Sequence, residues 1–394
     1  MKLARRQFLH LAAGIATQPA LSAREALAQR TGAIASLASP SAQERAEIAN
    51  IARACMQTYS LPGFSVAVGY RGAIAYQDAF GFADHESNQA LTPMHLFRIG
   101  SVSKPITAVA IFTLIERGRL KLTDKVFGPG AITGTDYGGP PFNAGVDEIT
   151  VEHLLTHTAG GWDSASDDPI YLPLANRLLN HTDLISWTLK NRPLVNPPGQ
   201  RFRYSNFGYC VLGRVVEKIT GKPYAAYVHA EVLKRCGITD MAIGGNTLEQ
   251  RFLGEVKYYG QEDKGEFPYG ENMSRADANG GWIARPADLV QFLMHVDGFD
   301  RSRNILSLQT IQTMIAPSAA APGYAKGWFV NKEFDNWWHT GTLAGVVGVA
   351  LRTHSGYCWA AFANSRRSGS PLEGELADSL IWNMVRQVKR WPPV

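Results

Sequence analysis

Apolar residues follow two patterns along this chain, one typical of helices and one typical of strands. Helical spacing marks the segment from Ile48 to Met56, which follows the capping pair Ser41 and Glu44. The same spacing recurs from Phe207 to Ile219. Alternating or continuous apolar runs bounded by turn residues predict a hairpin around Arg71-Gly72. Further strands are predicted over 327–330, 337–339, 346–351 and 358–363, before a final helix over about 372–390.

The predicted strands lie near both ends of the chain, whereas the middle is mainly helices and loops. Thr150 caps one predicted helix, and two more are expected over 286–296 and 308–315. The stretch 162–200 is expected to be rich in loops, with Asp163, Asp167 and Asp168 in solvent. This order predicts an α+β fold: an antiparallel sheet from about 41–118 and 316–394, flanked by helices, and a mainly helical region over about 119–315. A cleft is expected where the two parts meet.

Composition is that of an ordinary folded domain, with 45% hydrophobic and 19% charged residues among 394. The net charge is +5, but four basic residues and one acidic residue put +3 of it in the first 28 positions and leave +2 for the rest. No basic run with interleaved aromatics occurs, so no nucleic-acid partner is expected. No later segment is apolar for long enough to span a bilayer.

The first 28 residues have the pattern of an export signal. Arg5-Arg6 precedes the short apolar stretch Leu11–Ile15 and the small-residue sequence Ala26-Leu27-Ala28. This predicts a twin-arginine-type signal peptide over 1–28, a mature domain over 29–394, and a periplasmic or secreted location without a stable membrane anchor. The alternative is a cytoplasmic chain with a basic start.

The cysteines give no sign of a metal or redox motif. Cys55, Cys210, Cys236 and Cys358 are widely spaced and form no Cys-x-x-Cys pair. We expect them to be small buried hydrophobic residues, although three pairings are open to them in an oxidising compartment.

The segment from Phe97 to Gly118 contains the first candidate for chemistry, the pair Ser101 and Lys104. A helix starting near Ser101, with an apolar stripe along one side, would place both side chains on one face. A lysine that is partly removed from water can lose its charge and serve as the base that activates a serine. Taken alone, a capping serine beside a solvated lysine explains the pair equally well.

Two further clusters give this pair a chemical context: Tyr204-Ser205-Asn206, before a predicted helix, and His339-Thr340-Gly341-Thr342, on a predicted strand. A tyrosine beside an ammonium group is expected to have a lowered pKa and to move protons. An amide can hold the substrate and the lysine. A glycine on an edge strand lets a substrate approach, and the next N–H can complete an oxyanion hole.

These three motifs resemble those of the serine β-lactamase and penicillin-binding protein superfamily, within the branch of class C β-lactamases, D-peptidases (D-alanyl-D-alanine carboxypeptidases) and esterases. The segment Leu154–Gly160 is similar to the same branch. The resemblance covers nearly all of the predicted mature chain. It implies the β-lactamase/DD-peptidase-like fold and a hydrolase that forms an acyl-enzyme.

The resemblance implies a role for each motif residue. Ser101 would be the acylated nucleophile, Lys104 its activating partner, and Tyr204 the general base and then acid. Asn206 would orient substrate, and the N–H groups of Ser101 and Thr342 would form the oxyanion hole, with His339, Thr340 and Gly341 beside them. One departure stands out: this branch's class C β-lactamases carry lysine where this chain has His339. A histidine near its ordinary pKa of about 6.5 is mostly neutral at pH 7, so it offers no permanent cation to a substrate carboxylate.

Other functions are weighed against this one. His153 and His157 have the spacing of a zinc protease, but Leu154 stands where the glutamate would be, so neither a metal nor another cofactor is expected. A non-catalytic penicillin- or peptidoglycan-binding protein is opposed by the intact set of Ser101, Lys104 and Tyr204. The sequence therefore predicts an exported serine hydrolase that cleaves an ester or amide in a small-molecule or peptide substrate, peptidoglycan-derived peptides included. A β-lactamase is the alternative.

Overall fold

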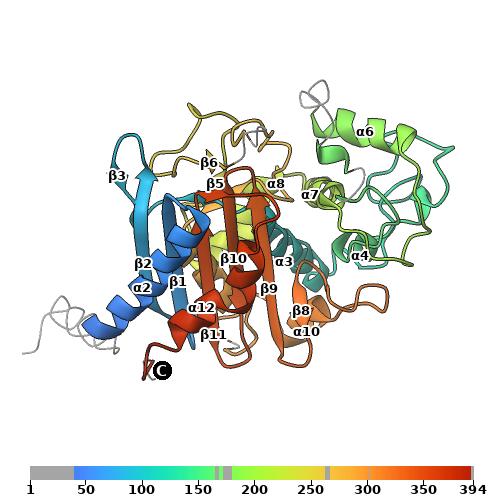
Figure 1. Ribbon diagram of the computed structural model, residues 1–394. Coiled ribbons are helices and arrows are strands. Elements are labelled where there is room, and N and C mark those ends of the chain that lie inside the picture. Colours follow the sequence, from blue (N-terminus) through green and yellow to red (C-terminus); the bar gives the residue numbers. More distant parts are fainter. Residues whose placement is uncertain (1–39, 165–167, 172–179, 262–266, 301, 392–394) are drawn as a thin grey trace, which may run out of the picture.

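The computed structural model describes residues 40–391, except 165–167, 172–179, 262–266 and 301. Its main feature is a seven-stranded antiparallel sheet in the order β3-β2-β1-β11-β10-β9-β8 (Figure 1). The first part of the chain contributes β1 (Gly63–Tyr70), β2 (Ala73–Asp84) and β3 (Gln89–Ala90). The last part contributes β8 (Phe329–Asn331), β9 (Asn336–Leu343), β10 (Val346–Arg352) and β11 (Tyr357–Ala363). Strands from both ends of the chain thus pair at β1 and β11.

The central strands are buried on both faces, which explains their nearly continuous apolar sequences. Along β11, Trp359 and Ala361 pack into one hydrophobic core, while Ala360 and Phe362 pack into the other. Because side chains alternate along a strand, each central strand supplies residues to two helical layers.

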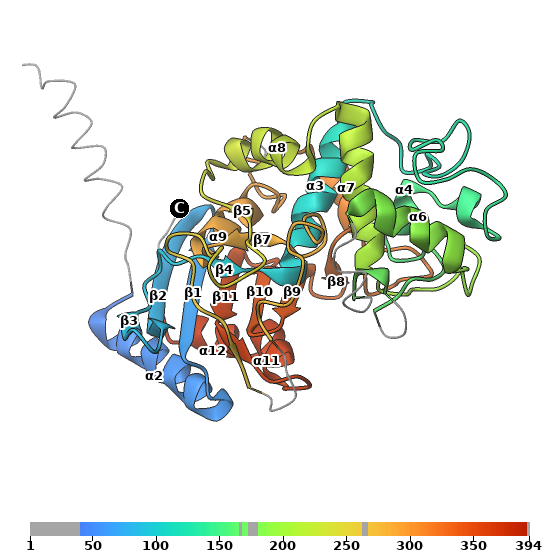
Figure 2. The same ribbon diagram turned by 90° about the horizontal axis from the view of Figure 1, so that it is seen from above.

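Three helices cover one face of the sheet: α2 (Ala42–Tyr59), α11 (Leu372–Asp378) and α12 (Leu380–Val385) (Figure 1). The other face is covered by α9 (Pro286–Met294), which packs on β1 and β11. Beside it, α3 (Ser103–Glu116) runs between the sheet and the helical region (Figure 2). The chain around α9, expected in the helical region, therefore lies against the sheet.

The helical region lies to one side of the sheet (Figure 1). It contains α4 (Val151–Leu155), α6 (His181–Asn191) and α7 (Asn206–Thr220), of which α7 packs on both α3 and α4. The chain returns toward the sheet through α8 (Tyr224–Val228) and later α10 (Leu308–Ile315). Short strands join the parts: β4 (Phe97–Arg98) and β5 (Ala242–Ile243) pair with β7 (Trp282–Ala284), and β6 (Tyr259–Gly260) pairs with β12 (Ser365–Arg366).

The predicted fold class is confirmed, as are the elements with strong local signals. The Ser41–Glu44 capping box starts α2, the hairpin turns at Arg71-Gly72, and Thr150 accepts a hydrogen bond from the His153 N–H at the start of α4. The helices predicted from Phe207 and over 308–315 are α7 and α10. The signal peptide predicted over 1–28 lies outside the described residues.

Several local predictions were wrong. Helix α3 is not amphipathic, because every residue from Ser103 to Leu114 is buried between the sheet and the helical region. The stretch expected to be loop-rich contains α6, and the final helix is interrupted at Ser379, where α11 ends and α12 begins. Asp163 and Asp168, expected in solvent, are buried, while Asp167 lies outside the described residues.

The four cysteines behave as predicted, since each is buried and unpaired with another cysteine. None of the helices in the described part of the chain combines the length and the apolar character needed to cross a bilayer.

Candidate active site

Ser101 lies in a short 3-10 turn, Gly100–Val102, immediately before α3. Gly100 has a positive φ of 51°, and a Cβ added to it would lie 2.9 Å from the backbone nitrogen of Thr342. Glycine is required here both by the backbone conformation and by the close approach of β9. The turn therefore holds the backbone of Ser101 against the strand that carries the third motif.

Lys104 is fully buried one helical turn after Ser101. Its Nζ atom lies 3.0 Å from Ser101 Oγ, 2.6 Å from Asn206 Oδ1 and 2.9 Å from the carbonyl oxygen of Asn279. Burial lowers the pKa of Lys104 to about 7, although the nearby carboxylate of Asp168 opposes this shift. At neutral pH a substantial fraction of this side chain is an uncharged amine.

The three contacts decide where the lone pair of that amine points. The Asn206 and Asn279 oxygens belong to amide carbonyl groups, which only accept hydrogen bonds, so they take the two N–H groups of the neutral amine. The lone pair is then left for the Ser101 hydroxyl. Lys104 is thereby placed to accept the proton of Ser101.

Asn206 is fixed in place at the start of α7. Its Nδ2 donates to Ser164 Oγ at 3.0 Å, and its backbone N–H donates to Asp168 Oδ2 at 2.6 Å. The Ser205 hydroxyl caps the same helix by accepting from the Gly208 N–H. Burial raises the pKa of Asp168 to about 6, while hydrogen bonds from the backbone N–H groups oppose the shift. These contacts hold the amide oxygen toward Lys104.

Tyr204 lies beside the same group. Lys104 Nζ is 4.8 Å from the centre of its ring, and the ring of His157 packs against it at 4.3 Å between centroids. Removal of water by the surrounding protein raises the pKa of Tyr204, and the negative charges of Asp168 and Glu373 add to the shift; a hydrogen bond with Ser101 opposes it. The lowered pKa expected for Tyr204 from the sequence was therefore wrong. The phenol keeps its proton at neutral pH.

Strand β9 carries the third motif along an open edge. Within the described residues, β8 pairs with β9 only from Asn336 to Trp338, and the edge beyond has no strand partner. A Cβ added at Gly341 would clash with the carbonyl oxygen of Ile99, so glycine lets this strand lie directly against the Ser101 turn. Thr340, in contrast, points toward α11, where its hydroxyl donates to Glu373 Oε1 at 2.6 Å.

His339 is buried behind this edge. Its Nδ1 lies 2.6 Å from the carbonyl oxygen of Thr340 and must donate to it, so Nε2 accepts from the hydroxyl of Tyr324 at 3.1 Å. Burial, together with the charge of Lys104, lowers the pKa of His339 to about 3. The side chain is neutral, as expected, and both of its nitrogens are bound within the protein.

A cavity of about 120 Å³ adjoins the site. Its lining includes Asn279, whose carbonyl holds Lys104, together with Tyr171 and Leu343. The side-chain Nδ2 of Asn279 is buried and has no hydrogen-bond partner in the described structure. An unpaired buried donor is costly, so this amide is suited to a carbonyl oxygen of a bound substrate.

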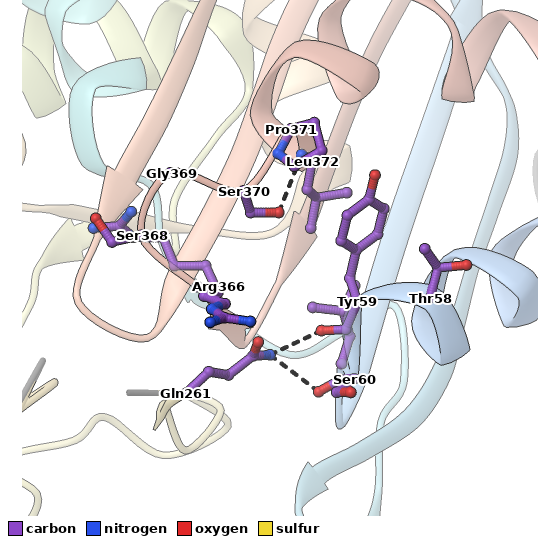
Figure 3. A pocket seen from close by; sticks show the side chains of 12 residues that line it. Thr58, Tyr59, Ser60, Gln261, Arg366, Ser368, Gly369, Ser370, Pro371 and Leu372 are labelled. Atoms are coloured by element: carbon purple, nitrogen blue, oxygen red, sulfur yellow. Dashed lines mark hydrogen bonds between the residues drawn. The ribbon is translucent and has the colours of Figure 1, made fainter. Parts of the chain in front are cut away.

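A second cavity, of about 390 Å³, lies between the end of α2 and the start of α11 (Figure 3). Figure 3 shows Arg366 beside it and the amide of Gln261, which donates to the carbonyl oxygens of Tyr59 and Ser60. The catalytic candidates are absent from its lining. Leu372, the residue before Glu373, lines this cavity.

The two histidines with zinc-protease spacing hold local structure, and only His153 is helical, because α4 ends at Leu155 and His157 has a positive φ of 57°. His153 Nδ1 accepts from the Thr150 N–H, and His157 Nδ1 accepts from the Ser205 N–H at 3.0 Å. Among the described residues, no group of three histidine, cysteine or acidic side chains is arranged to hold a metal ion.

The structure thus brings Ser101, Lys104, Tyr204 and Asn206 together, with Gly341 and Thr342 against the serine turn. Three nearby residues were missed from the sequence: Asp168, Asn279 and Glu373. Only Asp168 has a local sequence signal, because Asp-Pro-Ile-Tyr is typical of a turn in a stretch rich in aromatic residues. The other two have no local pattern that distinguishes them.

Comparison with known proteins identifies the family and the fold. The profile of the Beta-lactamase family matches residues 48–379. Protein flp of Staphylococcus aureus (strain MRSA252) is 25% identical over 348 residues, which are 84% of this chain and 64% of that protein. This chain therefore spans less than two thirds of the length of that curated relative.

Solved structures share the fold. The D-amino acid amidase from Ochrobactrum anthropi SV3, complexed with D-phenylalanine, superposes with a TM-score of 0.69 at 21% identity, covering 88% of this chain and 99% of that one. EstCE1, described as a hydrolase with promiscuous acyltransferase activity, gives 0.65 at 18% identity, covering 86% and 98%.

Proposed function

This chain belongs to the Beta-lactamase family, and from that premise we propose that it is a serine hydrolase that cleaves carboxylic esters or amides through an acyl-enzyme on Ser101. The observation that carries the proposal is the contact set of Lys104. Its pKa near 7 and its two carbonyl acceptors direct a neutral amine at the Ser101 hydroxyl.

The proposed reaction follows from these positions. Lys104 takes the Ser101 proton as Oγ bonds to the substrate carbonyl carbon, and the N–H groups of Ser101 and Thr342 stabilise the oxyanion. Tyr204, which carries its proton at neutral pH, gives it to the leaving group, and the proton that Lys104 took from Ser101 then restores the phenol. Water then hydrolyses the acyl-enzyme by the reverse transfers.

Esters and amides without a carboxylate are the favoured substrates. The neutral, fully bonded His339 leaves the third motif without the cation that a β-lactam carboxylate would need. The fold shared with a D-amino acid amidase and with EstCE1 supports amides of D-amino acids and simple esters as first choices. Peptidoglycan-derived D-peptides are further candidate substrates, to be compared with D-amino acid amides and simple esters. We expect β-lactams to be poor substrates or slow covalent inhibitors.

Intact mass spectrometry tests nucleophile and substrate class together. The protein is mixed with p-nitrophenyl butyrate, D-phenylalanine amide or benzylpenicillin, and Ser101→Ala is the control. Product release and the mass of the protein are followed together. We expect Ser101-dependent release of p-nitrophenol, with a loss of more than about 10³-fold in the variant. A penicilloyl adduct that forms on the wild type and persists would identify β-lactams as inhibitors. Ester hydrolysis that survives in Ser101→Ala would refute the proposal.

Export through the twin-arginine signal is part of the same proposal. Expression of the full chain in a bacterial host should give a periplasmic protein that begins near residue 29. Arg5→Lys together with Arg6→Lys should retain it in the cytoplasm. An uncleaved cytoplasmic wild type would refute export and leave the proposed chemistry untouched.

A further inference from the structure

The open edge of β9 carries a negative charge at its α11 side. Glu373, on α11, accepts the Thr340 hydroxyl at 2.6 Å, and its side chain is only half-buried. Within the described part of the chain, Glu373 makes no ion pair, and the Thr340 hydroxyl is its one hydrogen-bond partner. Its carboxylate therefore keeps free acceptor positions and an uncompensated charge beside the motif.

The other charged groups around this edge are bound or placed elsewhere. Lys104 is buried behind the serine and is directed at Ser101 and the two asparagine oxygens. Arg366 donates through Nε to the carbonyl of Leu343, the last residue of β9, and lines, with Arg367, the cavity that reaches Leu372. Glu271 and Arg275 line the small cavity on the Asn279 side. Among the described residues none of these cations is bonded to Glu373, so at Thr340 the nearest charge is the carboxylate of Glu373.

This side of the edge is where a leaving group would lie. The charge of Glu373 acts on Tyr204, the proton donor in the proposed reaction, and the Thr340 that holds Glu373 is flanked by His339 and Gly341 of the motif. The small cavity beside Asn279 is left for the acyl group.

We propose that Glu373, held by Thr340, selects substrates by the charge of the leaving group: it favours an ammonium group, tolerates a neutral one and disfavours a carboxylate. The inference rests on the proposed serine hydrolase function and assigns its substrate class. It makes Glu373 a specificity-determining residue beside the third motif.

Isosteric esters test the proposal. Butyrylcholine and 3,3-dimethylbutyl butyrate differ only by a nitrogen cation in place of a carbon, and both give the same butyryl-enzyme. The charge effect therefore appears in kcat/KM for acylation. We expect wild type to prefer butyrylcholine about five-fold, as an ion pair partly screened by water would give, and the preference to shrink with added salt.

Variants identify the residue. Glu373→Gln keeps the acceptor for Thr340 and should bring the ratio near one, while Glu373→Lys should favour the butyrate ester of 4-hydroxybutanoate. The matched control is Glu375→Gln, on the same helix, whose carboxylate accepts from Tyr59 and should leave the ratio unchanged. Ser101-dependent hydrolysis of the neutral ester shows that each variant is folded.

The outcomes separate the two proposals. If the neutral ester is hydrolysed through Ser101 but Glu373→Gln keeps the wild-type ratio, the assignment of Glu373 is overturned and the hydrolase function stands. If hydrolysis of the neutral ester is the same in Ser101→Ala, the function is overturned and the assignment of Glu373 falls with it.

Discussion

At the scale of single residues, the site depends on how far the protein lowers the pKa of one buried lysine. Because Lys104 acts as a base only when neutral, kcat/KM should rise with pH to a plateau, with a midpoint near 7. Lys104→Arg should lose at least about 10²-fold and lack this rise, since a guanidinium stays protonated. A pH profile of ester hydrolysis measures both. A wild-type rate that is flat between pH 5 and 9 would contradict the role of Lys104.

Asp168 adjusts that midpoint from its position at the start of α7. Its negative charge opposes the lowering of the Lys104 pKa, so Asp168→Asn should move the midpoint toward acid. The variant also weakens the bonds to the Asn206 and Phe207 N–H groups and should lower thermal stability. The pH profile separates the effects, because a purely structural role would reduce the rate without moving the midpoint.

At the scale of elements, the contact between β9 and the serine turn fixes the proposed oxyanion hole. Gly341→Ala would drive a methyl group into the Ile99 carbonyl, so the strand must move away and take the Thr342 N–H with it. We expect kcat to fall by about 10²-fold or more. Gly374→Ala is the matched control, because a Cβ there meets nothing within 4 Å and should leave kcat unchanged. Equal kcat values in the two variants would refute this account.

Elements with strong local signals were predictable, and those defined by distant contacts were not. The Ser41–Glu44 box and the Arg71-Gly72 turn need only neighbouring residues. Strands of two or three residues, such as β4, exist only because another segment pairs with them. Helix α3 is buried on all sides because it packs between the sheet and the helical region. The sequence of α3 alone does not show that both neighbours are present.

The same reasoning applies to the site. The candidate nucleophile and its neighbours were found because each lies in a short motif. Asp168, Asn279 and Glu373 act on motif residues 38, 175 and 33 positions away in the chain, so only the folded structure brings them together. The pKa of Tyr204 was mispredicted because the sequence shows the neighbouring lysine but not the loss of water or the two carboxylates.

At the scale of the whole molecule, the two hydrophobic cores on either face of the sheet enclose all four cysteines. Burial raises the pKa of Cys55, Cys210 and Cys236 to about 12 and that of Cys358 further, so thiolate is scarce at neutral pH. Protein purified without reducing agent should therefore show no free thiol to Ellman's reagent when native and four per chain when unfolded. Its melting temperature should be the same with and without dithiothreitol. A melting temperature that falls under reduction, with fewer than four thiols on unfolding, would mean that disulfides form and that at least one of these buried cysteines is displaced from its core position.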